Sequence, residues 1–204
     1  MHLSPAPEAM PIPWRSLNAL VLIVLAGCGS DAQPAIVQEL RDGGLVLVMR
    51  HAATESATPP SESLRSCDRQ RNLSAAGREQ ARAIGEAMRA LDVPIGDVRS
   101  SPMCRARDTA RLAFGRVEID RDLVSPGVIG TIEADDRRAA ALREMVHTAP
   151  PDGTNTVLVT HTGNIGAAFE ESVDEGELLA YDRGRLVGTL SPGELARAAD
   201  APPG

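Results

Sequence analysis

Two histidines in this sequence directly follow short apolar runs that are typical of buried strands. The run at residues 45–49 is followed by Arg50 and His51, and the run at residues 157–160 is followed by His161. An imidazole can act as a nucleophile or carry a proton, and a guanidinium beside it can bind an anion. One such histidine is more often structural than catalytic, so the pattern is informative only together with other residues.

A third fragment, SSPMCRARDTA, supplies a second arginine at the start of a predicted helix. Ser101 is a typical N-cap residue and Pro102 suits the first helical position. The helix is expected to end near residue 114, with Gly115 as its stop. Arg105 then lies in the first helical turn. The order strand–Arg–His, arginine at a helix start, strand–His rarely arises by chance.

Strands and helices alternate around these fragments. The further predicted elements are a weaker strand at residues 98–100, a helix at 75–91 capped by Ser74, a helix from Asp135 or Asp136 to about His147, and an edge hairpin at 181–190. This order predicts the α/β class, a three-layer α/β/α sandwich with a mostly parallel central sheet. Sites in such sheets form beyond the carboxyl ends of the strands.

Composition excludes several classes of function. Of the 204 residues 43% are hydrophobic and 24% are charged, which is typical of a globular chain. There is no lysine, so a Schiff base and a P-loop lysine are excluded. Aromatic residues are only 2% and the net charge is −7, which argues against nucleic acid as a partner. No metal-ligand spacing is found.

The N-terminal segment has the features of an export signal. Arg15 precedes a short apolar run at residues 19–26, and the tetrapeptide Leu-Ala-Gly-Cys that ends at Cys28 resembles a bacterial lipobox. An ordinary buried strand or helix is the alternative. Lipidation of Cys28, with Gly29 after it, predicts an exported protein anchored at the periplasmic face of the outer membrane. The expected divisions are a lipoprotein signal peptide at 1–27, the lipidated cysteine and a tether at 28–40, a catalytic domain at 41–195 and a flexible tail at 196–204.

Two further cysteines, Cys67 and Cys104, suit an oxidising compartment. They can form a disulfide or remain free thiols. Cys67 lies in a long segment at residues 56–71 that follows His51 and contains Arg65, Arg69 and Arg71. This segment can line the rim of a pocket and select substrate, or it can be a solvated loop.

Four stretches together resemble the histidine phosphatase (phosphoglycerate mutase-like) superfamily, over about residues 44–169. They are LVMRHA at 47–52, with alanine where the family has glycine, NLSAAGREQA at 72–81, SPMCRA at 101–106 followed by Thr109 and Ala110, and VTH at 159–161. The resemblance implies the phosphoglycerate mutase-like fold and a phosphoric ester hydrolase that needs no metal and no other cofactor.

The resemblance also implies roles for individual residues. His51 is the nucleophile that becomes a phosphohistidine, while Arg50, Arg105 and His161 stabilise the phosphoryl group. Cations aimed at the phosphoryl oxygens neutralise the charge that repels a nucleophile. The substrate-binding residues expected beside these are Thr54, Thr162 and Asn164.

The sequence departs from the family at the proton donor. Ala53 and Ala57 replace polar residues of many members, and Ser125 stands where many have a glutamate acid. The remaining candidate acids are Glu133, Glu177, Asp135 and Glu55. If none acts as an acid, the substrate should have a good leaving group, and a sugar-phosphate mutase is disfavoured.

Three hypotheses remain open. The first is a lipid-anchored phosphatase for a small phosphorylated compound, such as a sugar phosphate of the cell envelope. The second is a phosphoprotein or phosphohistidine phosphatase. The third is a non-catalytic phosphate-binding lipoprotein. The oligomeric state is not predicted.

Overall fold

The computed structural model describes residues 1–2, 35–57, 59 and 62–201. The described residues from Ala35 onward belong to one compact unit. The predicted signal peptide, apart from Met1 and His2, and the predicted lipidation site at Cys28 lie outside the described residues. Within the described residues, no helix is long and apolar enough to cross a bilayer.

A six-stranded sheet forms the centre of the compact unit. Its strand order is β3 (Glu118–Ile119), β2 (Ile95–Ser100), β4 (Asn155–Thr160), β1 (Val46–Arg50), β5 (Leu178–Asp182) and β6 (Arg185–Leu190). The first four strands are parallel, and the hairpin β5–β6 begins with a strand antiparallel to β1. The sheet is therefore mixed. It contains the parallel part and the edge hairpin that the sequence predicts.

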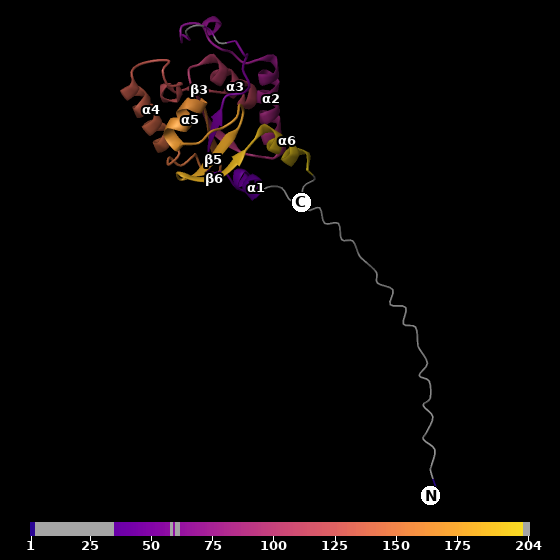
Figure 1. The fold of residues 1–204 in the computed structure, drawn as a ribbon. Helices are drawn as coiled ribbons and strands as arrows, with labels where there is room; N and C mark the ends of the chain where they lie inside the picture. Colours follow the sequence, from indigo (N-terminus) through magenta and orange to yellow (C-terminus); the bar gives the residue numbers. More distant parts are fainter. Residues whose placement is uncertain (3–34, 58, 60–61, 202–204) are drawn as a thin grey trace. The chain divides into compact units, whose positions relative to one another are not determined.

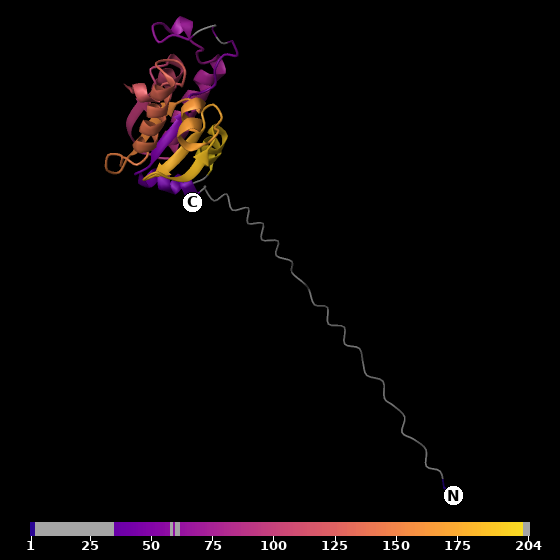
Figure 2. The ribbon, with the colours of Figure 1, turned by 60° about the vertical axis from the view of Figure 1, so that its left-hand side comes forward.

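Helices cover both faces of this sheet (Figures 1 and 2). One core contains residues of α1 (Ala35–Asp42), α2 (Ala75–Ala90), α3 (Cys104–Phe114) and α6 (Pro192–Asp200). The other contains residues of α4 (Ile132–Met145), α5 (Thr162–Phe169) and the short helix η2 (Arg121–Leu123). Along β1, Leu47 faces the first core while Val46 and Val48 face the second. The unbroken apolar run reflects burial on both sides, as in a parallel sheet, and the three-layer prediction is confirmed.

Both ends of the predicted domain need correction. The sequence predicts a tether within residues 28–40, but residues 35–40 of this range belong to α1, where Val37 and Leu40 are fully buried. It predicts a flexible tail at residues 196–204, but residues 196–200 of this range belong to α6. Ser191 and Glu194 form a capping box at the start of α6, and Leu195 packs in the core. Capping and apolar packing therefore order a segment whose composition alone predicts fraying.

Two helix starts also differ from the prediction. The helix expected at Ser101 begins at Cys104, because the Ser101 hydroxyl accepts a hydrogen bond from Met103 N (3.2 Å) before the helix starts. The helix expected at Asp135 or Asp136 begins at Ile132, one turn earlier. Gly115 does end α3, in the left-handed conformation with φ of 72°.

Gly77, in the first turn of α2, allows this helix to approach the loop that follows His51. A Cβ atom at Gly77 would lie 1.7 Å from the carbonyl oxygen of Ala53. We expect Gly77→Ala to lower the free energy of unfolding by about 2–3 kcal/mol, because backbone must move to admit the methyl group. Urea unfolding measures this. Gly166→Ala is the matched control, since its methyl group would meet only ordinary contacts at 3.7 Å; an equal loss in both variants would contradict the explanation.

Candidate active site

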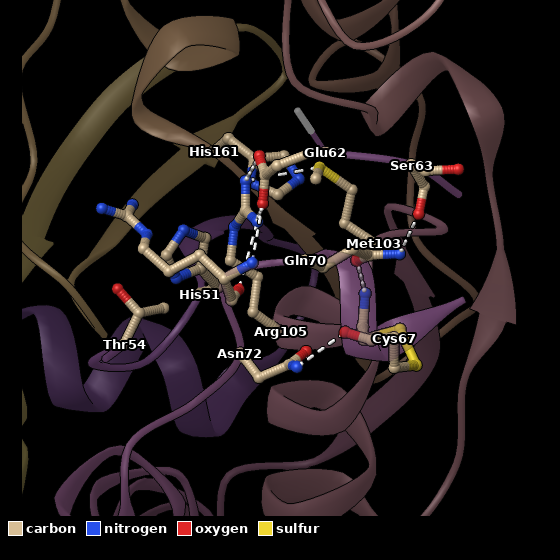
Figure 3. A network of polar contacts seen from close by, with 12 residues as sticks. His51, Thr54, Glu62, Ser63, Cys67, Gln70, Asn72, Met103, Arg105 and His161 are labelled. Atoms are coloured by element: carbon tan, nitrogen blue, oxygen red, sulfur yellow. Dashed lines mark hydrogen bonds and ion pairs between the residues drawn. A yellow bond between two sulfur atoms is a disulfide. The ribbon is translucent and has the colours of Figure 1, made fainter. Parts of the chain in front are cut away.

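Three neighbouring parallel strands bring the predicted site residues to one edge of the sheet. His51 follows β1, His161 follows β4, and Ser101 follows β2. Backbone hydrogen bonds continue the pairing by one residue beyond the strands, from His51 N to Thr160 O (3.1 Å) and from Ser101 N to Val159 O (3.0 Å). The two imidazole rings lie 5.2 Å apart, centroid to centroid, with an interplanar angle of 60° (Figure 3).

His51 is held as a neutral imidazole with one nitrogen available. Its Nδ1 lies 2.9 Å from the carbonyl oxygen of Ala52, which can only accept, so Nδ1 carries the proton and Nε2 keeps its lone pair. The pKa of His51 is lowered to about 3, mainly by burial and also by the charges of Arg105, Arg50 and Arg71, against the effect of the Ala52 carbonyl. A neutral imidazole with a free Nε2 is the form that can attack phosphorus.

His161 is also buried and neutral. Burial is the main cause that lowers its pKa well below the usual value, followed by its electrostatic interactions with His51 and Arg105. Its Nε2 lies 2.8 Å from the Ser101 hydroxyl, whereas its Nδ1 is buried and has no partner among the described residues. If the Ser101 hydroxyl donates to Nε2, Nδ1 carries a proton that is ready for an acceptor.

The two predicted arginines each have a carboxylate partner. Arg105 contacts Glu62 through both terminal nitrogens, at 2.5 and 3.2 Å. Arg50 donates to Val173 O (2.7 Å) and lies 3.7 Å from Glu175. The Nε atoms of both arginines are buried and without partners among the described residues.

Three buried nitrogen atoms at this strand edge therefore have no hydrogen-bond acceptor within the described part of the chain: Arg50 Nε, Arg105 Nε and His161 Nδ1. Buried polar groups in folded proteins are nearly always paired, so such atoms require an explanation. A tetrahedral oxyanion such as phosphate carries several acceptor oxygens and can satisfy several donors at once. The arrangement is thus suited to binding an anion beside the free nitrogen of His51.

Arg71 is a site residue that the motif analysis placed only in the rim segment. Its charge lowers the pKa of both histidines, yet its guanidinium has no hydrogen bond or ion pair in the described part of the chain. Its backbone is fixed on both sides, because its N donates to Glu62 (2.9 Å) and its O accepts from Arg105 (3.2 Å). Arg71 is therefore a cation next to the histidines that has no ion pair among the described residues, although its charge also acts on Glu62.

The rim segment is an ordered structure attached to α3. Cys67, in the short helix η1 (Cys67–Arg69), forms a disulfide with Cys104, the residue before Arg105. The buried Gln70 accepts from Cys104 N (2.8 Å) and donates to Ser63 O (3.0 Å). These bonds, visible in Figure 3, hold the segment beside Arg105.

The predicted substrate-binding residues are placed differently from one another. Thr54 lies near the histidines and donates to Glu175 (2.8 Å). Thr162 begins α5 and is exposed. Asn164 is buried and its amide donates to Thr160 Oγ1 (3.1 Å), so this side chain holds the end of β4 within the protein.

The candidate acids from the sequence lie apart from the two histidines or are engaged elsewhere. Glu133 is fully exposed at the start of α4, and hydrogen bonds from Thr131 and its own backbone lower its pKa. Glu177 closes a turn by accepting from Asp174 N (2.7 Å). The remaining two are Asp135, which pairs with Arg138, and Glu55, which is exposed.

Sequence reasoning missed the two carboxylates that contact the site arginines, Glu62 and Glu175. Burial raises the pKa of Glu62, but hydrogen bonds from Arg105 and from Arg71 N outweigh it, so the pKa is lowered overall. Glu62 is therefore ionised at neutral pH. Neither residue belongs to a motif, so no sequence signal identified them.

Comparisons with known proteins agree with this geometry. The pattern of the histidine phosphatase superfamily (branch 1) matches residues 46–125. Similar solved structures include a phosphoglycerate mutase from Thermus thermophilus (21% identity, 72% of this chain and 98% of that chain, TM-score 0.53). A phosphoserine phosphatase mutant from Entamoeba histolytica is 14% identical over 74% and 98% of the chains, with a TM-score of 0.52. No curated protein matches the sequence.

A third similar structure is a putative phosphohistidine phosphatase, SixA, from Agrobacterium tumefaciens (21% identity, 74% of this chain and 99% of that chain, TM-score 0.50). At these identities the likenesses establish the fold. The fold and the paired histidines define an α/β protein of the phosphoglycerate mutase-like class. The superfamily pattern, at residues 46–125, includes Arg50, His51 and Arg105.

The low pKa of His51 makes stability depend on pH. Between pH 6.5 and about 3 the unfolded chain binds a proton at this residue and the folded chain does not, so stability falls as the pH falls. We expect wild type to lose about 2 kcal/mol more unfolding free energy between pH 7 and pH 5 than His51→Asn does. Urea unfolding in phosphate-free buffer measures the difference. His147→Asn, at an exposed turn, controls for loss of an imidazole. The same acid sensitivity in all three proteins would refute the assignment.

Proposed function

We propose that this protein is a phosphatase that hydrolyses phosphomonoesters, without a metal, through a phosphohistidine on His51. The observation that carries the proposal is that Arg50 Nε, Arg105 Nε and His161 Nδ1, three of the buried nitrogens without a partner among the described residues, accompany a neutral His51. These atoms supply donors for phosphoryl oxygens, while His51 supplies the nucleophile. Donors fixed in advance around developing charge are the main source of catalysis in phosphoryl transfer.

The reaction has two steps. His51 Nε2 attacks phosphorus, the bond from phosphorus to the leaving oxygen breaks, and the released oxyanion takes up a proton from water. Water then attacks the phosphorus, the N–P bond breaks, and orthophosphate leaves with His51 neutral again. Arg50, Arg105 and His161 hold the phosphoryl oxygens in both steps, with Arg71 as a further cation near the histidines.

The substrate class follows from the location and from the carboxylates. The export signal and the lipidation of Cys28 that the sequence predicts support a location at the periplasmic face of the outer membrane, and this location favours a small phosphorylated compound, such as an envelope sugar phosphate, as the substrate. Glu62 and Glu175 are both engaged by arginines. A substrate whose leaving group needs little protonation is therefore favoured.

The engagement of Glu62 and Glu175 by arginines also favours a second candidate, a phosphohistidine phosphatase. An imidazole leaving group departs more readily than an alkoxide, and one protein with this fold is described as a putative phosphohistidine phosphatase. The periplasmic location predicted from the sequence makes a phosphorylated protein the weaker choice. Relative rates on phosphoimidazole, an aryl phosphate and a sugar phosphate distinguish the two candidates.

The test is to trap the intermediate. The full chain is incubated with p-nitrophenyl phosphate in the presence of EDTA and then quenched in alkali. We expect turnover, together with an alkali-stable, acid-labile phosphate on the peptide that contains His51. Turnover without this phosphopeptide would overturn the mechanism, and loss of turnover in EDTA would overturn the metal independence. Binding of phosphate without turnover would support the non-catalytic hypothesis instead.

A further inference from the structure

The carboxylate of Glu62 is bound to the guanidinium of Arg105, which the proposed function assigns to the substrate. Its Oε1 accepts from Arg105 Nη1 (2.5 Å) and from Arg71 N (2.9 Å), and its Oε2 accepts from Arg105 Nη2 (3.2 Å). In Figure 3 this carboxylate lies against the guanidinium of Arg105, next to His161. Two parallel N–H bonds to one anion are the geometry by which arginine also binds phosphate.

The hydrogen-bond capacity of Arg105 is almost exhausted in this state. Besides Glu62, Nη1 donates to Arg71 O (3.2 Å) and Nη2 donates to Met103 Sδ (3.4 Å). Each terminal nitrogen carries two hydrogens, so all four have acceptors and only the Nε–H remains. Arg105 cannot offer two terminal N–H groups to a phosphoryl group until Glu62 leaves.

Glu62 lies on the solvent side of this pair. The side chain of Arg105 is 5% exposed and that of Glu62 is 18% exposed. The terminal nitrogens of Arg105 are thus less accessible to solvent than the carboxylate bound to them. The partial exposure also gives the displaced carboxylate access to water, where an ionised group is well solvated.

Charge matching supports an exchange of anions. The two site arginines are each matched by a carboxylate, Glu62 or Glu175, while Arg71 has none among the described residues. These five side chains carry one net positive charge with Glu62 in place and two after it leaves. A phosphomonoester at neutral pH carries close to two negative charges, which matches the site without Glu62.

We propose that Glu62 is an internal competing anion, which substrate and product displace from the two terminal nitrogens of Arg105 so that these nitrogens add to the contact offered by the free Nε–H. The inference rests on the proposed function in taking a phosphoryl group as the ligand. The return of Glu62 to Arg105 favours release of orthophosphate, so this residue sets the affinity of the site. Because the displacement is common to every ligand, it weakens all phosphate-like anions by the same factor.

The experiment compares wild type with Glu62→Gln, which keeps the shape of the side chain and removes its charge. Dissociation constants for orthophosphate and for tungstate are measured by calorimetry in full-length proteins that also carry His51→Asn, so that no turnover is needed. We expect both constants to fall by the same factor, about tenfold or more, the size typical of a charged hydrogen-bonded contact. With His51 present, KM for p-nitrophenyl phosphate should fall by that factor without a rise in kcat.

Glu55→Gln is the matched control, because it removes a nearby exposed charge that has no ion pair with an arginine among the described residues. It should change the anion affinities by less than about threefold. An unchanged affinity in Glu62→Gln, or a kcat loss of more than tenfold with KM unchanged, would overturn the proposal, the latter by making Glu62 a positioning residue. If wild type binds neither anion, the proposed function itself fails.

A readout on the unaltered protein keeps the proposal testable if Glu62→Gln does not fold. In a crystal structure of the wild-type chain with tungstate bound between His51 and His161, the Glu62 carboxylate must be away from Arg105. Tungstate bound there with both Glu62–Arg105 contacts intact would refute the displacement.

Discussion

Replacing His51 with asparagine is expected to lower kcat at least about 10⁴-fold, a loss of about 5 kcal/mol in transition-state stabilisation. The asparagine amide can still donate to the Ala52 carbonyl that now accepts from Nδ1. It has no counterpart of Nε2, so no N–P bond can form. Turnover of p-nitrophenyl phosphate in EDTA measures the loss.

The control for this variant is anion binding. Arg50, Arg105 and His161 remain in place, so orthophosphate should bind with a dissociation constant within about threefold of the wild-type value, as expected when a nucleophile is removed without losing the groups that bind phosphate. Lost binding together with lost turnover would indicate that the site has collapsed. Residual turnover above about 1% would show that His51 is not the nucleophile, given the size of effect expected for one.

The position of the two histidines could be predicted because strand pairing fixes it. The apolar runs before His51 and His161 identify two buried strands, and the carboxyl ends of parallel strands share one edge of a sheet. The register of β1 and β4 then places the two histidines side by side, because Arg50 pairs with Thr160 and each histidine follows its strand. Local sequence and a general rule of sheet topology were sufficient for this part of the site.

The partners of the arginines could not be predicted in this way. Glu62 is 43 residues from Arg105 in sequence, in a segment without periodicity, and a disulfide with hydrogen bonds from Gln70 places it. Arg71 lies in the same irregular segment, and only its backbone contact with Arg105 reveals its proximity to the histidines. Contacts that depend on the path of an irregular segment leave no pattern in the sequence.

Removal of the disulfide tests how much the stability of the protein depends on the cross-link that holds this segment. Cys67 and Cys104 are 37 residues apart, and a cross-link of this span lowers the entropy of the unfolded chain by an amount worth about 4 kcal/mol. We therefore expect the double variant Cys67→Ser, Cys104→Ser to lose about 4 kcal/mol of unfolding free energy in urea. Wild type treated with a reductant should approach the same value, and an unreduced wild type no more stable than the double variant would contradict the expectation.

The double variant Cys67→Ser, Cys104→Ser should lose less activity than stability. The histidines and their hydrogen bonds depend on β1, β2 and β4, whereas the cross-link holds only the segment with Glu62 and Arg71. Gln70 still joins that segment to Cys104 N through the backbone of residue 104, which the serine retains. We expect kcat/KM for p-nitrophenyl phosphate to fall by less than about tenfold, or about 1.4 kcal/mol. A loss as large as that of His51→Asn would mean that the segment, and not the strand edge, positions the nucleophile.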